Sequence, residues 1–304
     1  MTADPFDSFD GTVGRSDLEQ ELYTTILQII TAAGQNSPRS HQMEVGPSDV
    51  GNPCERALGY RYAELPVINL QPANDPWASI VGTSIHTWLA ETFTAADPVR
   101  WLTEQRVYPD NDLMARGGSS DVYDTVTENV IDWKTNGVAA LREFKKTGPV
   151  LLHRYQAHIY GLGWEAAGRT PANVAIVALP RSGRLRESFV HVEPYDPAVA
   201  QEALERARAI RGRVLAPEGQ ALALTRLETA DNYCGSCRYL DPGSLNASAG
   251  CPGSQVMDRL ARDLAAASSY DELLAMYDTT GGLWSASLIR LAAERRAELE
   301  RNPA

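Results

Sequence analysis

The chain has 304 residues and a formal net charge of −11 at pH 7, which argues against a protein that coats nucleic acid through its overall charge. An enzyme with a local basic patch stays compatible with that balance. Hydrophobic residues make up 43% and charged residues 22%, which suits a globular protein, and no apolar run is long enough to span a membrane. The opening MTADPFDSFDGT lacks a signal-peptide pattern, which favours a cytoplasmic protein with a loose leader.

The first third of the chain carries mainly helical signals. Residues 1–15 are expected to be disordered, and the capping box SDLE starts a helix at Ser16. A short helix is expected after Cys54, and residues 77–96 form a strong helical pattern. Strand signals follow in 100–109, 113–126 and 129–135, the second kinked by Gly117 and Gly118.

Helices and strands then alternate. Helices are expected over 138–146 and 149–168, strands over 173–181 and 186–194, and a long helix over 196–216. A cysteine-rich segment and two C-terminal helices, around 269–278 and 283–300, complete the order. Three consecutive strands followed by mixed elements favour a mixed α/β or α+β core over a doubly wound sheet.

The most informative strand is NVIDWKT. Alternate side chains of a strand share a face, so Asp132 and Lys134 point the same way, and burying such a pair is costly without a purpose. Asp121 would lie beside Asp132 if the two strands pair as a hairpin. Adjacent carboxylates repel unless a cation lies between them, and hard divalent metals prefer oxygen ligands. The triplet alone also fits a solvated Asp–Lys pair in a turn.

Two helical motifs flank these strands. GTSIH places His86 on the helix before them, and QAHIY places Gln156 and Tyr160 one helical turn apart. Each motif alone fits an ordinary helix. In this order, G-x-x-x-H, an Asp after a Gly/Ser-rich strand, D-x-K and Q-x-x-x-Y resemble the RecB-like branch of the PD-(D/E)xK nuclease superfamily, over roughly residues 46–255.

The resemblance implies a restriction-endonuclease-like fold of mixed α/β class, with a central mixed sheet flanked by helices. It also implies three parts: a leader with a helix over 1–45, a nuclease domain over 46–255, and a helical extension over 256–304.

The resemblance further implies roles for individual residues. A Mg²⁺ or Mn²⁺ ion would be held by His86, Asp121, Asp132 and the backbone carbonyl of Trp133. Lys134 would position the attacking water, and Gln156 and Tyr160 would steady the catalytic strand and the nucleic-acid backbone. Glu104 would support the site from the first strand.

The four cysteines are divided one plus three, at Cys54, Cys234, Cys237 and Cys251. In a reducing compartment such a set indicates metal ligands, and spacing alone favours zinc over iron. The arrangement resembles that of the CRISPR-associated RecB-like exonucleases and AddB-type nuclease domains, which implies a structural 4Fe–4S cluster that closes the chain around the core. The gap before Cys251 is longer than usual there. Small buried thiols without metal are the remaining alternative.

The expected partner is DNA, as single strands or duplex ends. Arg181, Arg184 and Arg186 are candidate contacts to its backbone, because they lie beside a strand end. The arginines of the long helix, at 206, 208, 211 and 213, are interpreted as solvated surface. No membrane contact is expected, and a homo-oligomer or partners from recombination and repair are left open.

The resemblance implies a metal-dependent DNA exonuclease, with endonuclease activity left open. The length of the chain fits a stand-alone nuclease, for example of a phage. The alternatives are a non-catalytic DNA-binding module that keeps the fold, and a nuclease closed by zinc.

Overall fold

The computed structural model describes residues 16–36, 44–68, 75–217, 220–234, 237–241, 249–280 and 286–301. The chain divides into two compact units. The sheet unit comprises Met43–Glu64 and Trp77–Ala223, and the helical unit comprises Met1–Gln42, Leu65–Pro76 and Leu224–Ala304. The disorder expected for residues 1–15 lies outside the described residues, and the expected boundaries at 45 and 255 stay predictions.

A five-stranded mixed sheet forms the centre of the sheet unit, in the spatial order β1-β2-β3-β4-β5. Its strands are β1 (Trp101–Val107), β2 (Gly118–Asp124), β3 (Asn129–Asn136), β4 (Asn173–Pro180) and β5 (Phe189–Pro194). Neighbours pair antiparallel except for β3 and β4, which are parallel. The parallel pair requires a crossover, which α6 (Val138–Thr147) and α7 (Leu151–Ala166) provide.

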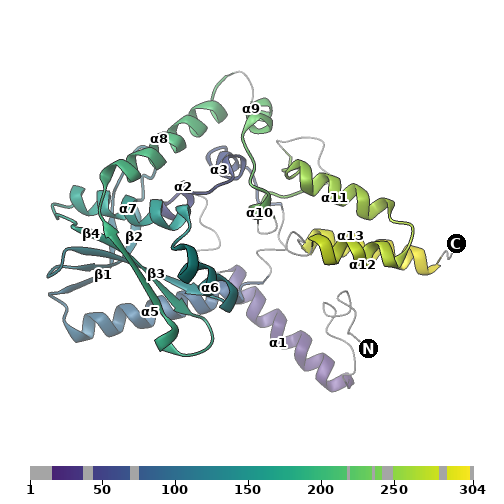
Figure 1. Ribbon diagram of the computed structural model, residues 1–304, viewed down its shortest axis with the longest axis horizontal. Coiled ribbons are helices and arrows are strands. Elements are labelled where there is room, and N and C mark those ends of the chain that lie inside the picture. The colour runs from purple at the N-terminus through teal and green to yellow at the C-terminus, as the bar shows by residue number, and fades with distance from the viewer. Residues whose placement is uncertain are drawn as a thin grey trace. The chain divides into compact units, whose positions relative to one another are not determined.

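Helices cover both faces of this sheet (Figure 1). On one face, Leu141 and Phe144 of α6 and Tyr160 and Trp164 of α7 pack on buried side chains of the sheet. On the other face, α5 (Trp77–Ala96) packs through Ile85, Leu89 and Phe93. A mixed sheet flanked by helices is what the restriction-endonuclease-like resemblance implies, so the predicted fold class is confirmed.

The remaining helices of the sheet unit lie around α7. These are α2 (Pro47–Val50), α3 (Glu55–Tyr62) and α8 (Pro197–Val214), and a single 3-10 turn, η2 (Leu185–Glu187), precedes β5. Both α2 and α8 contact α7, and α3 contacts α8. Helix α9 (Gln220–Arg226) crosses the boundary between the units.

The helical unit contains α1 (Asp17–Gln35), α10 (Asp231–Cys234), α11 (Gln255–Ala266), α12 (Tyr270–Thr280) and α13 (Ala286–Arg301). The capping box at Ser16 is present as predicted, because its hydroxyl accepts the Glu19 N–H and the Glu19 carboxylate accepts the Ser16 N–H. Helix α11 was not expected from the sequence. Among the described helices, none combines the length and apolarity that crossing a membrane requires.

One strand prediction needs correction. Residues 113–116 form turns, and β2 starts only at Gly118, because Gly117 has a left-handed backbone with a φ of +61°. The glycine pair therefore marks the beginning of the strand and does not kink its middle.

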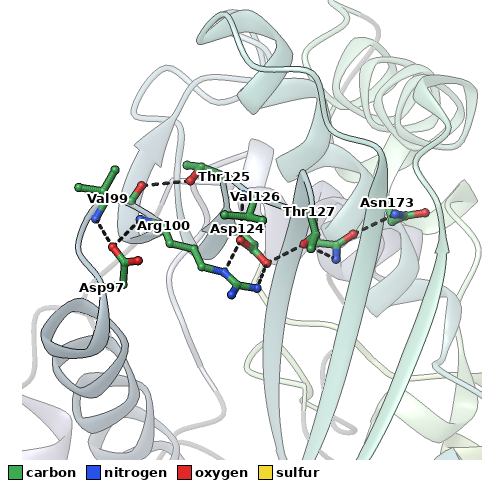
Figure 2. A network of polar contacts seen from close by, with 9 residues as sticks. Asp97, Val99, Arg100, Asp124, Thr125, Val126, Thr127 and Asn173 are labelled. Atoms are coloured by element: carbon green, nitrogen blue, oxygen red, sulfur yellow. Dashed lines mark hydrogen bonds and ion pairs between the residues drawn. The ribbon is translucent and has the colours of Figure 1, made fainter.

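A buried carboxylate fixes the turn between β2 and β3 (Figure 2). Arg100 donates from Nε to Asp124 Oδ1 over 2.9 Å and from Nη2 to Oδ2 over 2.8 Å. The Val126 N–H and the Thr127 hydroxyl donate to the same carboxylate, over 3.0 and 2.6 Å. The two bonds from Arg100 join the chain before β1 to the β2–β3 turn, and the two from Val126 and Thr127 close the turn itself. Together they help to align the three strands that carry the candidate site.

Asp124→Asn is expected to destabilise the fold by about 1–3 kcal/mol at pH 7, because it weakens a charge-assisted pair that is nearly buried. Burial opposes ionisation of Asp124, but the bonds from Arg100, Thr127 and Val126 outweigh it and lower its pKa from 3.8 to about 2. Because the pKa of Asp124 is lower in the folded than in the unfolded chain, its ionised carboxylate stabilises the fold above pH 4. This stabilisation is lost as the pH falls through 2. Urea unfolding should therefore show that the difference in unfolding free energy between wild type and Asp124→Asn becomes smaller as the pH falls from 4 to 2. The control Glu91→Gln, on the exposed surface of α5, should leave the unfolding free energy unchanged at both pH values.

Candidate active site

The candidate site lies where β2 and β3 separate. The last paired residues are Val122 and Ile131, and Asp121 and Asp132 are the next residue of each strand beyond that pair. The antiparallel pairing expected for these strands is thus present. Beyond this point the Trp133 N–H donates to Asp121 Oδ2 over 2.7 Å, so a carboxylate replaces the backbone partner that the departing strand no longer supplies.

His86 approaches Asp121 from α5. Its Nδ1 lies 3.1 Å from Asp121 Oδ1, so each oxygen of this carboxylate has a different neighbour. Burial opposes protonation of His86, but the hydrogen bond and the charge of Asp121 outweigh it and raise the pKa of the imidazole. The pair therefore concentrates negative charge beside a nitrogen that can coordinate a metal when it is neutral.

Glu104 of β1 completes a group of three. One ligand atom each from His86, Glu104 and Asp121 lies within 4.8 Å of the other two, and the searched, described part of the chain holds no other such group. The Ser119 hydroxyl holds Glu104 by donating to Oε2 over 2.6 Å. Glu104 was expected only to support the site. Its position follows from tertiary pairing, because its polar neighbours in TEQR give no signal that singles it out.

The backbone at Glu104 is strained. Its φ of +50° is left-handed, which costs a residue with a Cβ about 1–2 kcal/mol. Leu102 and Val107, five residues apart, both pack in the core beneath α7, although strict alternation would place them on opposite faces. The alternation of β1 is therefore broken between them, where Glu104 lies. Strain of this kind persists where the surrounding structure fixes it, and such positions cluster at functional sites.

Two substitutions separate the strain at Glu104 from its carboxylate. Glu104→Gly and Glu104→Ala should both lower Mn²⁺ affinity, by about tenfold or more, because both remove a ligand. The glycine variant should be more stable than the alanine variant by about 0.5–1 kcal/mol, because only glycine adopts a positive φ freely. Calorimetric Mn²⁺ titration and urea unfolding measure the two effects.

The neighbouring Gln105 provides the matched control for Glu104. It lies in regular strand, so Gln105→Gly should be less stable than Gln105→Ala, the opposite order. An unchanged Mn²⁺ affinity in both Glu104 variants would remove Glu104 from the proposed metal site.

Asp132 and Lys134 lie on the same face of β3, as the alternation of a strand predicts. Asp132 is 1% exposed, and Lys134 Nζ lies 2.7 Å from its Oδ2. Lys134 Nζ also donates to Gln156 Oε1 over 2.8 Å, and Gln156 Nε2 donates to Tyr160 Oη over 3.5 Å. The structure therefore brings together the predicted D-x-K pair and the predicted Q-x-x-x-Y pair.

The carboxylate of Asp132 is poorly satisfied. Lys134 Nζ forms an ion pair with Oδ2, and no other donor among the described residues reaches either oxygen. Burial raises the pKa of Asp132 to about 6, helped by the charge of Asp121 and opposed by Lys134. Asp132 is not one of the three residues whose ligand atoms lie within 4.8 Å of one another. Its buried oxygens, which only a lysine approaches, lie near the charges of Asp121 and His86, and such a set fits a hard divalent cation such as Mg²⁺ or Mn²⁺.

Helix α7 is held firmly above these strands. Arg154 donates to Glu193 of β5 from Nε and Nη2, each over 2.8 Å. The Asp196 N–H donates to His158 Nδ1, so His158 Nε2 carries its proton and donates to Glu193 over 3.3 Å. These contacts fix the part of α7 that carries Gln156.

Tyr160 packs against the start of β2. A Cβ at Gly118 would lie 3.0 Å from Tyr160 Cε1 and 2.5 Å from Pro47 Cγ, so glycine permits this approach. Burial raises the pKa of Tyr160, and the charges of Asp132 and Asp121 raise it further. The phenol therefore stays protonated as a donor near the site.

Other predicted residues lie at varying distances from this group. The Trp133 side chain packs on the opposite face with Phe93, at a ring-centroid separation of 5.3 Å, and the role of its carbonyl stays a prediction. Arg181, Arg184 and Arg186 are exposed on the connection between β4 and β5. Arg181 donates from Nη2 to the Thr135 carbonyl over 3.4 Å, which holds this connection against the end of β3.

The cysteines are all buried. Within the helical unit, the Cys237 N–H donates to the Cys234 carbonyl over 3.0 Å. Cys251 returns to the same segment, because it forms a bridge with Leu240 and its N–H donates to the Tyr239 carbonyl over 2.7 Å. The backbone thus returns Cys251 to the stretch that carries Cys234 and Cys237 despite the long sequence gap. Among the described residues, no three cysteine sulfur atoms lie within 4.8 Å of one another, so a shared metal centre stays a prediction.

Cys54 belongs to the sheet unit. It caps the first turn of α3, where the Ala57 N–H donates to its Sγ over 3.4 Å. Hydrogen bonds to sulfur are a feature of iron–sulfur ligands. Its membership of one centre with the other three thiols stays a prediction.

The chain was compared with known proteins. No family model matches it, and no curated protein matches it. Among solved structures, it is similar to an alkaline exonuclease (LHK-Exo) from Laribacter hongkongensis, with a TM-score of 0.41 and 16% sequence identity over 57% of this chain and 88% of the other. Its function has to be argued from its own residues.

Proposed function

We propose that this protein is a metal-dependent deoxyribonuclease that hydrolyses phosphodiester bonds. The observation that carries the proposal is the convergence of His86, Glu104 and Asp121 with the buried Asp132–Lys134 pair where β2 and β3 separate. Oxygen ligands, one imidazole and a lysine in one place suit hydrolysis of a phosphate ester better than they suit a structural role.

Each side chain has a distinct task in this proposal. His86, Glu104, Asp121 and Asp132 would hold a Mg²⁺ or Mn²⁺ ion, with the Trp133 carbonyl as a further ligand. When bound, such an ion polarises a phosphoryl oxygen and makes a coordinated water more acidic. Lys134 Nζ, positioned by Asp132 and Gln156, would donate to the attacking water or to a phosphate oxygen as charge develops.

Gln156 and Tyr160 would act through Lys134, and by the resemblance they would also steady the catalytic strand and the nucleic-acid backbone. The Gln156 side chain accepts from Lys134 and donates to Tyr160, so it limits the directions in which the ammonium can point. Because Tyr160 keeps its proton, it can complete this chain over a wide pH range. Positioning of this kind lowers the activation barrier of hydrolysis, although neither Gln156 nor Tyr160 transfers a proton.

The finer assignment follows the RecB-like resemblance. We propose exonuclease action on single-stranded DNA ends, and a structural 4Fe–4S cluster on Cys54, Cys234, Cys237 and Cys251. The burial of all four thiols and the return of Cys251 to the segment of Cys234 and Cys237 are compatible with such a cluster, with zinc as the alternative occupant. Every catalytic position of the motif set is filled, which favours an enzyme over a binding module that keeps the fold.

Cleavage of end-labelled DNA tests the activity. Single- and double-stranded oligonucleotides are incubated with the protein and Mg²⁺, Mn²⁺ or EDTA, beside Asp132→Ala and Lys134→Ala. Metal-dependent loss of the end label by wild type alone is expected. Equal, metal-independent background in all three proteins would leave the non-catalytic module as the better interpretation.

A further inference from the structure

Positive charge in this acidic chain is distributed unevenly. The arginines of α8 are engaged: Arg206 and Arg213 pair with Glu55 over 3.5 and 3.8 Å, Arg211 pairs with Asp112 over 2.8 Å, and Arg208 pairs with Asp110. Their charge is compensated within the fold, so this helix offers little attraction to an anion. Solvated surface was expected for these arginines, whereas the structure engages them in ion pairs and leaves Arg206 and Arg211 half-buried.

A second group of cations is not compensated in this way. Six exposed side chains from α6 and from the β4–β5 connection make no ion pair with any residue in the described ranges. The two segments that carry them follow the C-terminal ends of β3 and β4, which are adjacent parallel strands (Figure 1). The six side chains are Arg142, Lys145, Lys146, Arg181, Arg184 and Arg186. All three lysines of the chain lie on β3 and α6, at 134, 145 and 146.

A pocket of about 240 Å³ opens among these cations. Asn136, Arg142, Lys145 and Ser182 contribute polar groups to its lining, and Leu141 forms an apolar part of it. Glu187 is the acidic residue of the lining, and its Oε2 accepts the Arg184 N–H over 3.1 Å. Two cations, an amide and a hydroxyl around a small recess provide the donors that a phosphate group requires.

The pocket continues directly from the candidate active site. Lys134 and Asn136 lie on the same face of β3, two residues apart, which corresponds to about 7 Å along a strand. The Asn136 amide is fixed there by donating to the Lys134 carbonyl over 2.8 Å. An extended nucleic-acid strand with one phosphate at Lys134 would therefore pass next over this recess.

We infer that the pocket between α6 and the β4–β5 connection holds the backbone phosphate of a nucleic-acid strand next to the phosphate that is cleaved. The inference rests on the proposed function and adds the direction in which the substrate strand leaves the metal site. It assigns Arg142 and Lys145 as the direct phosphate contacts, with Asn136 and Ser182 as neutral donors. Arg181, Arg184 and Arg186 surround the mouth of the pocket.

Lysine footprinting tests this inference sharply, because the chain has only three lysines. The native protein is acetylated briefly with and without a saturating single-stranded oligonucleotide, in Ca²⁺, which takes the same oxygen ligands as Mg²⁺. Mass spectrometry then gives the acetylation rate at each lysine. We expect the oligonucleotide to slow acetylation of both Lys134 and Lys145, by about fivefold or more at Lys145.

The footprint separates failure of the inference from failure of the proposed function. Protection of Lys134 without protection of Lys145, in a protein that cleaves DNA, would overturn the pocket and leave the nuclease intact. Protection of neither lysine, together with absent metal-dependent cleavage, would count against both.

Binding measurements provide a second test with matched variants. Arg142→Gln should weaken oligonucleotide binding and reduce the slope of log K against log salt by about 0.7, the value for one phosphate contact on a single strand. Arg213→Gln, which removes an equal charge from the compensated helix, should leave the slope unchanged. An unchanged slope in Arg142→Gln would overturn the assignment of this contact.

Gly137, beside the pocket residue Asn136, can be replaced by two side chains of the same shape and different charge, Asp and Asn. It precedes α6 without a side-chain cap, and a Cβ there would meet no atom within 4 Å. Gly137→Asp and Gly137→Asn should both fold and cap α6, but only Asp should weaken oligonucleotide binding, by about fivefold or more, through repulsion. Equal affinities for the two variants would contradict a phosphate site here.

Discussion

Lys134→Ala is expected to lower kcat for DNA cleavage by about a thousandfold while leaving Mn²⁺ affinity nearly unchanged. The ammonium is not a metal ligand, so its loss removes stabilisation of charge that develops only in the transition state. Asp121→Asn should instead weaken Mn²⁺ binding, because Asp121 meets both His86 and the Trp133 amide. Calorimetric titration with Mn²⁺ and single-turnover cleavage measure the two quantities.

The decisive expectation for Lys134→Ala is that kcat falls while Mn²⁺ affinity does not. Lys146→Ala removes another lysine of the chain, one outside the site, and should keep kcat within about twofold of wild type. Loss of Mn²⁺ binding in Lys134→Ala would show that the ammonium supports the metal ligands and not the reaction. Cleavage retained in Lys134→Ala would exclude it from the chemistry.

Cys237→Ser is expected to abolish the proposed cluster and lower thermal stability strongly. A 4Fe–4S centre requires four thiolates, and a metal that binds only the folded chain adds its binding free energy to the stability of the fold. Wild-type protein purified without oxygen should be brown and contain about four iron atoms per chain. Iron and sulfide analysis, visible absorption and thermal unfolding are the readouts.

Cys54→Ser tests whether the distant thiol shares that centre. Cys54 lies in the sheet unit and Cys237 in the helical unit, so equal loss of iron in the two variants would indicate one set of ligands. Stoichiometric zinc without iron in wild type would replace the cluster by the zinc alternative. Unchanged stability and no metal in any sample would reduce the thiols to small buried residues.

Local sequence was sufficient for most of the elements. The capping box at Ser16 starts α1, the helical pattern of 77–96 coincides with α5, and the apolar run NVIDWKT forms β3, because capping and periodicity act within a few residues. The same alternation placed Asp132 and Lys134 on one face. The expected hairpin pairing of the two strands is present, and it ends at Val122 and Ile131, one residue before Asp121 and Asp132.

Tertiary structure decided the rest of the site. Nothing in TEQR distinguishes Glu104, whose left-handed backbone and approach to His86 and Asp121 exist only when β1 pairs with β2 beneath α5. The need for glycine at position 118 is likewise tertiary, because Pro47 and Tyr160 pack where a Cβ would lie.

The tertiary structure also decided which arginines are available to bind an anion. As sequence, the arginines of α8 and those near α6 are equivalent clusters of positive charge. Folding brings Glu55, Asp110 and Asp112 to α8, whereas no carboxylate of the described residues pairs with Arg142. The sequence thus determined which residue types and periodicities were present, and the tertiary structure decided which charges remain available, because ion pairs form between residues that are distant in the chain.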